Sequence, residues 1–369
     1  MLEFHWRTVD EVDDRLYQAW TQLGMQTAHT NLYAMPQFVL PASRLLDPGN
    51  PARIAVIERR NAGGSELLGV GCFTHHRPTL FAPLPHLRCF RTRHTFQDGL
   101  LCAPGAAQEV ADALLGHLDR GVRGPQAIAF RNVADDDPVL QALRGRADAA
   151  GQRWYPLRAL QRPVLRYDAA PDARSRIPRR VAGDIERRQR RLAASGRLSF
   201  RLLLGADVTD EAIARHLDIE HMGWKGNSHS SMRSSATETA FFEDMCRRFR
   251  AIGSTVFCET LLDGRVIASA SGFRVAATMN AFKTAHDPEF SGASPGKANI
   301  LSLLAAIPAA LPEVAMFDSS SREGSFIGAM LPDSRTMLAG FLPLTRLAAR
   351  ALKAARLLRP LAYRIDDDP

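Results

Sequence analysis

Three observations on the sequence predict a protein built from two α/β modules. Its 369 residues are many for one domain but enough for two domains that each bury a core. Apolar residues make up 46% and charged residues 23% of the chain, which is typical of folded globular proteins. Segments with helical and strand periodicity also follow one another in a similar order in each half. We therefore expect two modules in tandem, each a mixed, largely antiparallel sheet flanked by helices.

The first module is expected over residues 1–165. Apolar residues at helical spacing predict helices over 10–23, 106–118 and 138–150. Alternating or continuous apolar runs predict strands over 52–58, 66–73 and 127–130. The first two of these strands flank an Asn-Ala-Gly-Gly turn, which indicates a hairpin.

The second module is expected over residues 166–340, with the joint between the modules near 165–176. Helices are predicted over 210–221, 238–252 and 297–311, and strands over 198–204, 255–262, 265–273, 278–285 and 314–317. Asp263-Gly264 is a tight-turn signal, so three of these strands should form an antiparallel meander. A third segment, 341–369, contains a basic amphipathic helix over 342–358 that either docks on the core or lies on an anionic membrane surface.

Composition argues against several classes of protein. The beginning of the chain shows no secretory signal pattern, and Pro308 and Pro312 interrupt the most apolar stretch, 298–317. The five cysteines are odd in number and form no CxxC pair, which argues against a disulfide framework and a structural zinc site. We expect a cytoplasmic protein that needs no metal.

The chain carries a net charge of +8, supplied almost entirely by arginine. Only four lysines occur, Lys225, Lys283, Lys297 and Lys353, and three of them fall between residues 225 and 297. A run of arginines spans 174–201, with apolar residues at helical spacing within it. Such a run is most simply a solvated helix face, but it could also bind an acidic lipid-linked sugar or tRNA.

Several short motifs occur in a fixed order in the second half. After the basic helix come EHMGWKG at 220–226, LDGRVIA at 262–268, FKTAHDP at 282–288, SPG at 294–296, and Asp318. In this order and spacing, residues 174–320 resemble the GNAT-like acetyltransferase domain of cellulose and exopolysaccharide biosynthesis proteins. That family is related in fold to the Fem-type aminoacyl transferases of peptidoglycan synthesis. A fainter likeness covers 36–39 and 98–101.

The resemblance implies acetyl-CoA or another acyl-CoA as the acyl donor. Ser294, Gly296 and Lys297 stand between a predicted strand and a predicted helix. The start of a helix offers unbonded N–H groups and the positive end of its dipole, which suit a pyrophosphate. A Ser-Pro pair is also a common way to begin a helix without any ligand.

Candidate catalytic and acceptor-binding residues lie in the other motifs. His286 is the preferred general base because an imidazole titrates near neutral pH, with Asp287 beside it and Glu220 and Glu259 as competing bases. Trp224, Lys225, Lys283 and Asp318 are the candidate substrate-binding residues. Each has a structural alternative: a histidine that only packs, a buried tryptophan at a helix end, or an aspartate that caps a turn.

We expect an N-acyltransferase that acetylates an amine of a sugar, a polysaccharide precursor or a related small molecule. The amine would attack the thioester directly, without a covalent enzyme intermediate. Two alternatives stay open: a Fem-like transferase that uses aminoacyl-tRNA, and a non-catalytic accessory protein of exopolysaccharide assembly. Candidate partners are the inner face of an anionic membrane and a polysaccharide-synthesis complex; apart from tRNA, nucleic acid is a minor prospect.

Overall fold

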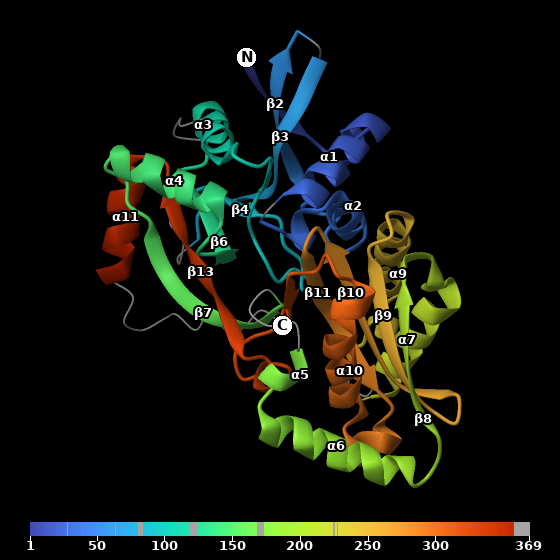
Figure 1. Ribbon diagram of the computed structural model, residues 1–369. Coiled ribbons are helices and arrows are strands. Elements are labelled where there is room, and N and C mark those ends of the chain that lie inside the picture. The colour runs from blue at the N-terminus through green and yellow to red at the C-terminus, as the bar shows by residue number, and fades with distance from the viewer. Residues whose placement is uncertain are drawn as a thin grey trace. The chain divides into compact units, whose positions relative to one another are not determined.

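The computed structural model describes residues 1–27, 29–62, 64–79, 84–118, 124–167, 173–223, 226 and 228–357, without the side chains of 173, 174 and 355–357. The chain divides into two compact units (Figure 1). The first unit is Met1–Leu160 with Thr336–Pro369, and the second is Gln161–Arg335. The chain passes into the second unit within strand β7 (Tyr155–Arg166) and returns within β13 (Asp333–Pro343).

The first unit is a mixed sheet with helices packed on it. Its strand order is β1-β2-β3-β4-β6-β13-β7; β4 and β6 are parallel, whereas the β1–β2, β2–β3, β3–β4 and β6–β13 pairs are antiparallel. Its further elements are β1 (Leu2–Arg7), α1 (Asp14–Gln26), α2 (Pro36–Leu45), β2 (Arg53–Asn61), β3 (Gly64–His76), β4 (His86–Cys89), β5 (Leu101–Cys102), α3 (Ala107–His117), β6 (Ala127–Ala134), α4 (Pro138–Ala149) and α11 (Arg346–Leu357), with short 3-10 turns η1 (Val9–Glu11) and η2 (Leu32–Ala34).

Local sequence accounts for these helices. Asp13 caps α1, since its carboxylate accepts the Leu16 N–H at 2.8 Å. Trp20 on the inner face of α1 is fully buried and donates its ring N–H to the carbonyl of Ala34. Pro36 begins α2, where its missing N–H and fixed φ cost nothing.

The second unit repeats this order of elements. Its sheet runs β7-β12-β11-β10-β9-β8, and only β11 and β12 are parallel. Its elements are α5 (Ala173–Arg176), α6 (Arg179–Ala193), β8 (Leu198–Leu204), α7 (Asp210–Met222), α9 (Ala236–Ala251), β9 (Thr255–Leu262), β10 (Arg265–Val275), β11 (Thr278–His286), α10 (Pro295–Ala310) and β12 (Met316–Asp318), with 3-10 turns η3 (Gly205–Asp207), η4 (Met232–Ser234), η5 (Pro288–Ala293) and η6 (Gly328–Met330).

Helices cover both faces of the second sheet. On one face, Asn299 of α10 lies 3.4 Å from the Cys258 thiol of β9 and also donates to the Cys258 carbonyl. On the other, the Phe257 ring of β9 lies 6.4 Å from the Phe242 ring of α9. Successive residues of a strand point to opposite faces, so α10 and α9 lie on opposite sides. Helix α6 packs on the α10 side (Figure 1).

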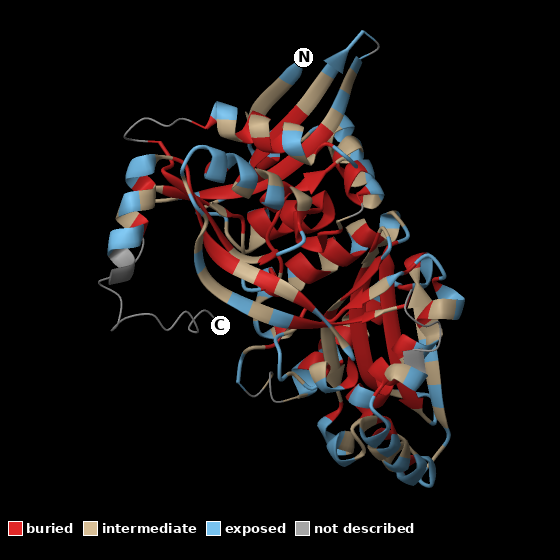
Figure 2. Cartoon of the chain, turned by 60° about the vertical axis from the view of Figure 1, so that its left-hand side comes forward, coloured by how far each residue is buried: buried red, intermediate tan, exposed pale blue. Residues whose placement is uncertain are grey.

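Burial follows the two sheets and the inward faces of their helices (Figure 2). Helix α6 shows the pattern clearly: Ala182, Ile185 and Leu192 are buried, whereas Arg179 and Arg180 are exposed. The apolar spacing within the arginine run therefore marks the buried stripe that anchors this helix.

The predicted antiparallel meander is present as β9, β10 and β11. Asp263 and Gly264 join the first two strands with φ of 49° and 82°, as the tight turn requires. Strands β1, β4, β5, β7 and β13 and helix α2 are not among the predicted elements. The last helix begins at Arg346 rather than 342, because the preceding residues form a strand in which Met337, Ala339 and Phe341 alternate into the core.

Helix α11 packs within the first unit. Leu352 belongs to a buried cluster with Ala129 and Phe341, and Ala348 is fully buried. Within the ranges described above, no helix combines the length and the apolar character needed to cross a membrane.

Candidate active site

Strand β11 carries a bulge at Phe282. Ser271 of β10 pairs with Lys283 and Gly272 pairs with Ala281, so Phe282 is left between two paired residues. A Cβ at Gly272 would come within 2.5 Å of the Asn280 carbonyl oxygen, which explains why glycine stands there. The bulge turns Phe282 toward Phe242 of α9, whereas Thr284 and His286 face the start of α10.

The short strand β12 pairs with β11 only along the first part of β11. Thr278, Met279 and Asn280 pair with residues 316–318, after which β12 ends and β11 continues to His286. From Ala281 onward no residue of β12 pairs with β11, so the parallel pairing leaves an opening beside the carboxyl end of β11. In α/β sheets, ligands tend to bind at such an opening.

Helix α10 begins beside the end of β11. Ser294 precedes it in the left-handed region, at φ 53°, and makes no side-chain capping hydrogen bond. A Cβ on Gly296 would lie 3.5 Å from Nδ1 of His286 and 3.9 Å from Oγ1 of Thr284. That threonine oxygen is buried and has no hydrogen-bond partner among the described residues. A buried polar atom without a partner beside a helix start indicates a place for a polar ligand.

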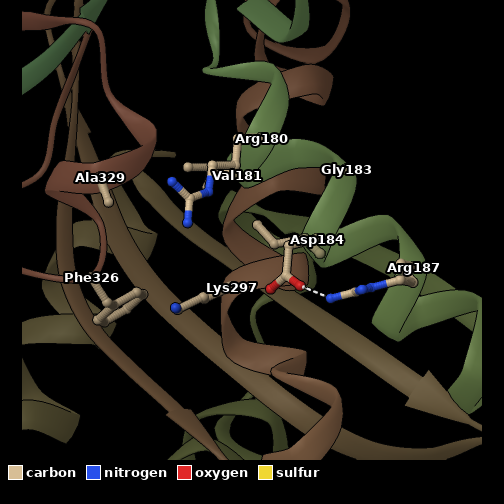
Figure 3. A pocket seen from close by; sticks show the side chains of 9 residues that line it. Arg180, Val181, Gly183, Asp184, Arg187, Lys297, Phe326 and Ala329 are labelled. Atoms are coloured by element: carbon tan, nitrogen blue, oxygen red, sulfur yellow. Dashed lines mark hydrogen bonds and ion pairs between the residues drawn. The ribbon is translucent and has the colours of Figure 1, made fainter.

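A cavity of about 780 Å³ opens where α6, the start of α10 and η6 meet (Figure 3). Lys297 of α10 and Arg180 of α6 direct their cationic groups into it, and Phe326 and Ala329 line the opposite wall. Arg187 also lines the cavity and forms an ion pair with Asp184. Three cations against one carboxylate make this a cavity suited to an anion.

The basic helix also fixes the loop that leads into α10. Arg188 donates to the Gly292 carbonyl at 2.9 Å, and Gln189 donates to the Ala293 carbonyl at 3.0 Å. Part of the arginine run is therefore structural: α6 holds η5 in place, which sets the position of Ser294 and the first turn of α10.

His286 is half-buried at the end of β11. Desolvation lowers the pKa of its imidazole, although the nearby Asp287 carboxylate acts in the opposite direction. Its Nε2 lies 3.2 Å from Oγ of Ser291, and that hydroxyl donates its only proton to the Pro288 carbonyl. This network favours the tautomer with the proton on Nε2, which leaves Nδ1, on the side of Gly296, as the nitrogen that can accept a proton.

The candidate carboxylates are engaged in structural contacts. Asp287 is buried, accepts the Glu289 N–H at 3.0 Å and pairs with Arg265. Asp318 is buried at the end of β12, where it accepts the Ser320 N–H at 2.7 Å and lies 3.5 Å from Arg162.

The other two carboxylates lie on the opposite face of the sheet from α10. Glu220 of α7 is buried and accepts the Met232 N–H at 3.0 Å. Glu259 is fully buried between Arg201 and Arg215.

Lys283 also lies on the face away from α10. Its cross-strand partner, Ser271, contacts His216 of α7, whereas His286 pairs with Ala268 on the α10 side. The structure thus places His286 beside Gly296 at the start of α10, where the next residue, Lys297, lines the cavity, and it places Lys283 and Glu220 on the other side of the sheet. Trp224 and Lys225 lie outside the described residues.

Sequence reasoning missed part of the cavity. The sequence shows Arg180 and Arg187 only as members of an arginine run. They are seven residues apart, so helical spacing alone could have placed them on the same side of α6. Phe326 and Ala329 carry no signal in the sequence, because a short 3-10 turn brings them to the cavity.

The first unit also contains a parallel strand pair, but residues of its own chain occupy the space beyond that pair. There, β4 pairs in parallel with β6, and Asp98 forms a bridge to Val133 farther along. The buried Asp98 carboxylate accepts the Arg131 N–H and pairs with Arg91, both at 2.6 Å. Within the described residues, the cationic cavity therefore belongs to the second unit.

A bulged strand, a shorter parallel neighbour that ends before it and a helix that starts beside the end of the bulged strand together form a mixed α/β fold of the GNAT type. Residues 179–320 match the family described as "Acetyltransferase (GNAT) domain". Residues 179–320 of the second unit are thus similar to a GNAT acetyltransferase domain, and this match supports a transferase.

Solved structures share the fold over nearly the whole chain. The FemX structure is 11% identical at a TM-score of 0.58, and the match covers 91% of this chain and 98% of FemX. A conserved protein of unknown function from Bacteroides thetaiotaomicron is 13% identical at a TM-score of 0.54, with 92% and 99% coverage. The C-terminal domain of a protein described as a lysylphosphatidylglycerol synthetase from Agrobacterium fabrum is 12% identical at a TM-score of 0.50, with 93% and 96% coverage. No curated protein matches the chain significantly.

Proposed function

We propose that this chain is an acyl-CoA-dependent N-acyltransferase whose donor binds in the second unit. The observation that supports this most strongly is the cationic cavity at the start of α10, with Lys297 and Arg180 directed into it. Coenzyme A carries a pyrophosphate, and a helix start without a side-chain cap, next to two cations that form no ion pair among the described residues, is a favourable place for that group. Ser294 and Gly296 are the backbone positions that would approach the phosphates.

The thioester would lie in the opening between β11 and β12, with the acceptor amine delivered to it. The amine must lose a proton as it attacks, and Nδ1 of His286 is the acceptor atom we propose for that proton. The lowered pKa of His286 keeps the imidazole neutral at pH 7, the state a general base needs. Asp287 would act indirectly, by fixing the turn that follows His286.

The acceptor is proposed to be an amine of a sugar, a polysaccharide precursor or a related small molecule, as the sequence resemblance to exopolysaccharide biosynthesis proteins implies. Lys283, Asp318, Trp224 and Lys225 stay proposals as acceptor-binding residues. We also keep a cytoplasmic location, with contact at an anionic membrane surface, as a proposal.

Calorimetry with acetyl-CoA tests the donor directly, after mass spectrometry of small molecules that co-purify with the protein. We expect one acetyl-CoA per chain, and amine-dependent release of free CoA thiol when candidate amino sugars are added. Failure to bind acetyl-CoA, CoA or longer acyl-CoA would contradict the proposal.

The aminoacyl-tRNA alternative rests on the outer face of α6. Arg190 and Arg191 have no ion partner among the described residues, and a polyanion could bind there. A gel-shift assay with charged tRNA, repeated at rising salt, separates the two donors. Tight tRNA binding together with no affinity for acyl-CoA would favour the alternative.

A further inference from the structure

An aromatic side chain stands exposed beside the cationic cavity. Phe326 is 41% exposed and lines the same cavity as Lys297 and Arg180 (Figure 3). Of the five large apolar side chains exposed in the described part of the chain, it is the only aromatic one. Single exposed apolar residues need no explanation by themselves, but a ring next to a cluster of cations does.

The loop that carries Phe326 is anchored on both sides of it. Ser325 bonds to the Ser321 hydroxyl at 2.8 Å and accepts the Gly328 N–H at 3.0 Å. Ile327 and Met330 are buried in the core of the second unit. Because its neighbours are fixed, the Phe326 ring is held at the cavity rather than left on a loose segment.

Within the described structure, Phe326 stacks on no other ring and lies over no cation. The ring is therefore not engaged by another ring or by a cation, and at 41% exposure it can contact a ligand in the cavity that it lines. A flat ring beside phosphate-binding cations is the arrangement by which proteins hold nucleotides, since a base can stack on the ring while the cations hold the phosphates.

We propose that Phe326 stacks on the adenine of the acyl donor and thereby makes the site selective for donors that end in a nucleotide. This inference rests on the proposed function, because it assigns a further part of the same donor to the same cavity. Phe326 would separate coenzyme A from donors that carry only 4′-phosphopantetheine. Lys297 and Arg180 would hold phosphates: the phosphate that both donors carry on the pantetheine arm, and the phosphates next to the adenosine that only coenzyme A carries.

The test compares CoA with 4′-phosphopantetheine by calorimetry on the full chain. Wild-type protein should prefer CoA, and Phe326→Ala should weaken CoA binding by about 10-fold, or about 1.4 kcal/mol, and leave 4′-phosphopantetheine unchanged. Phe326→Leu should behave like Phe326→Ala, because it keeps apolar contact but loses the ring, whereas Phe326→Trp should retain CoA affinity. Leu347→Ala, at another exposed apolar residue, is the control.

Saturation-transfer NMR gives a direct readout of the contact. The adenine protons of CoA should receive strong transfer from wild-type protein and weak transfer from Phe326→Leu. If CoA binds and Phe326→Leu changes neither its affinity nor the adenine signal, the stacking proposal is wrong while the proposed function stands. If wild-type protein binds no CoA at all, both fail.

Discussion

Reversing the charge of Lys297 separates the ligand-binding role of this lysine from any structural one. Its side chain is exposed at the third position of α10, points into the cavity, and forms no ion pair among the described residues. A unit charge about 4 Å from a phosphate contributes about 1 kcal/mol in water. Lys297→Glu removes that attraction and adds a comparable repulsion, so acetyl-CoA binding should weaken by about 2 kcal/mol, or about 30-fold. Lys297→Met should give roughly half that loss in free energy.

Folding stability should move in the opposite direction. A glutamate in the first turn of a helix interacts favourably with the helix dipole, by about 0.3–1 kcal/mol. Lys297→Glu should therefore keep or slightly raise Tm while it weakens the donor, and the loss of affinity should shrink at high salt because the charges are exposed. Calorimetry and thermal unfolding measure the two effects on the same sample.

Lys353→Glu is the matched control, because Lys353 is exposed on α11 in the first unit and the substitution changes the net charge equally. If Lys353→Glu weakens acetyl-CoA as much as Lys297→Glu does, the effect is one of overall charge. If Lys297→Glu binds acetyl-CoA like wild type, the start of α10 is not the phosphate site.

Three further substitutions probe the surroundings of this site. His286→Gln should lower kcat more than acetyl-CoA affinity. The wild-type rate should fall only at a pH below the usual histidine range, because the pKa of His286 is lowered and the base acts when neutral. If His286→Gln loses only acetyl-CoA affinity, His286 is instead a donor-binding residue. Gly272→Ala should reduce the free energy of unfolding by about 1–3 kcal/mol, measured by urea denaturation, because the new methyl group meets the Asn280 carbonyl oxygen at 2.5 Å; unchanged stability would show that the bulge can relax. Asp287→Ala should cost about 1 kcal/mol of stability through the lost cap and the lost partner of Arg265, with acetyl-CoA affinity retained; a large loss of affinity at unchanged Tm would refute this structural role.

Periodicity predicted most of the elements of the second unit, because each has a clear amphipathic pattern and a local signal at one end. Thr209 caps α7, and the Asp263-Gly264 turn joins β9 to β10. Strands β7 and β13 escaped prediction because each runs through both units, and its strand partners change along its length. A single periodic pattern does not describe such a strand.

The candidate site, too, could be predicted from the sequence only in part. Sequence order suggested that Ser294, Gly296 and Lys297 start a helix after a strand, and the structure has that arrangement. The faces of β11 could not be assigned by simple alternation, because the bulge at Phe282 shifts the pattern by one residue. The remaining wall of the cavity comes from α6 and η6, segments distant in sequence from α10, and only tertiary packing brings them to it.

The interrupted course of the first unit has a consequence for how the protein is made. Strand β13 lies between β6 and β7 in that unit's sheet, yet it follows the entire second unit in the chain. On the ribosome, the second unit can complete its own fold while the first still lacks a central strand and leaves the edges of β6 and β7 unpaired. A premature stop shortly after Arg335 would therefore damage mainly the unit that is synthesised first, and the transferase domain would emerge attached to a partner with an open sheet that is prone to aggregate.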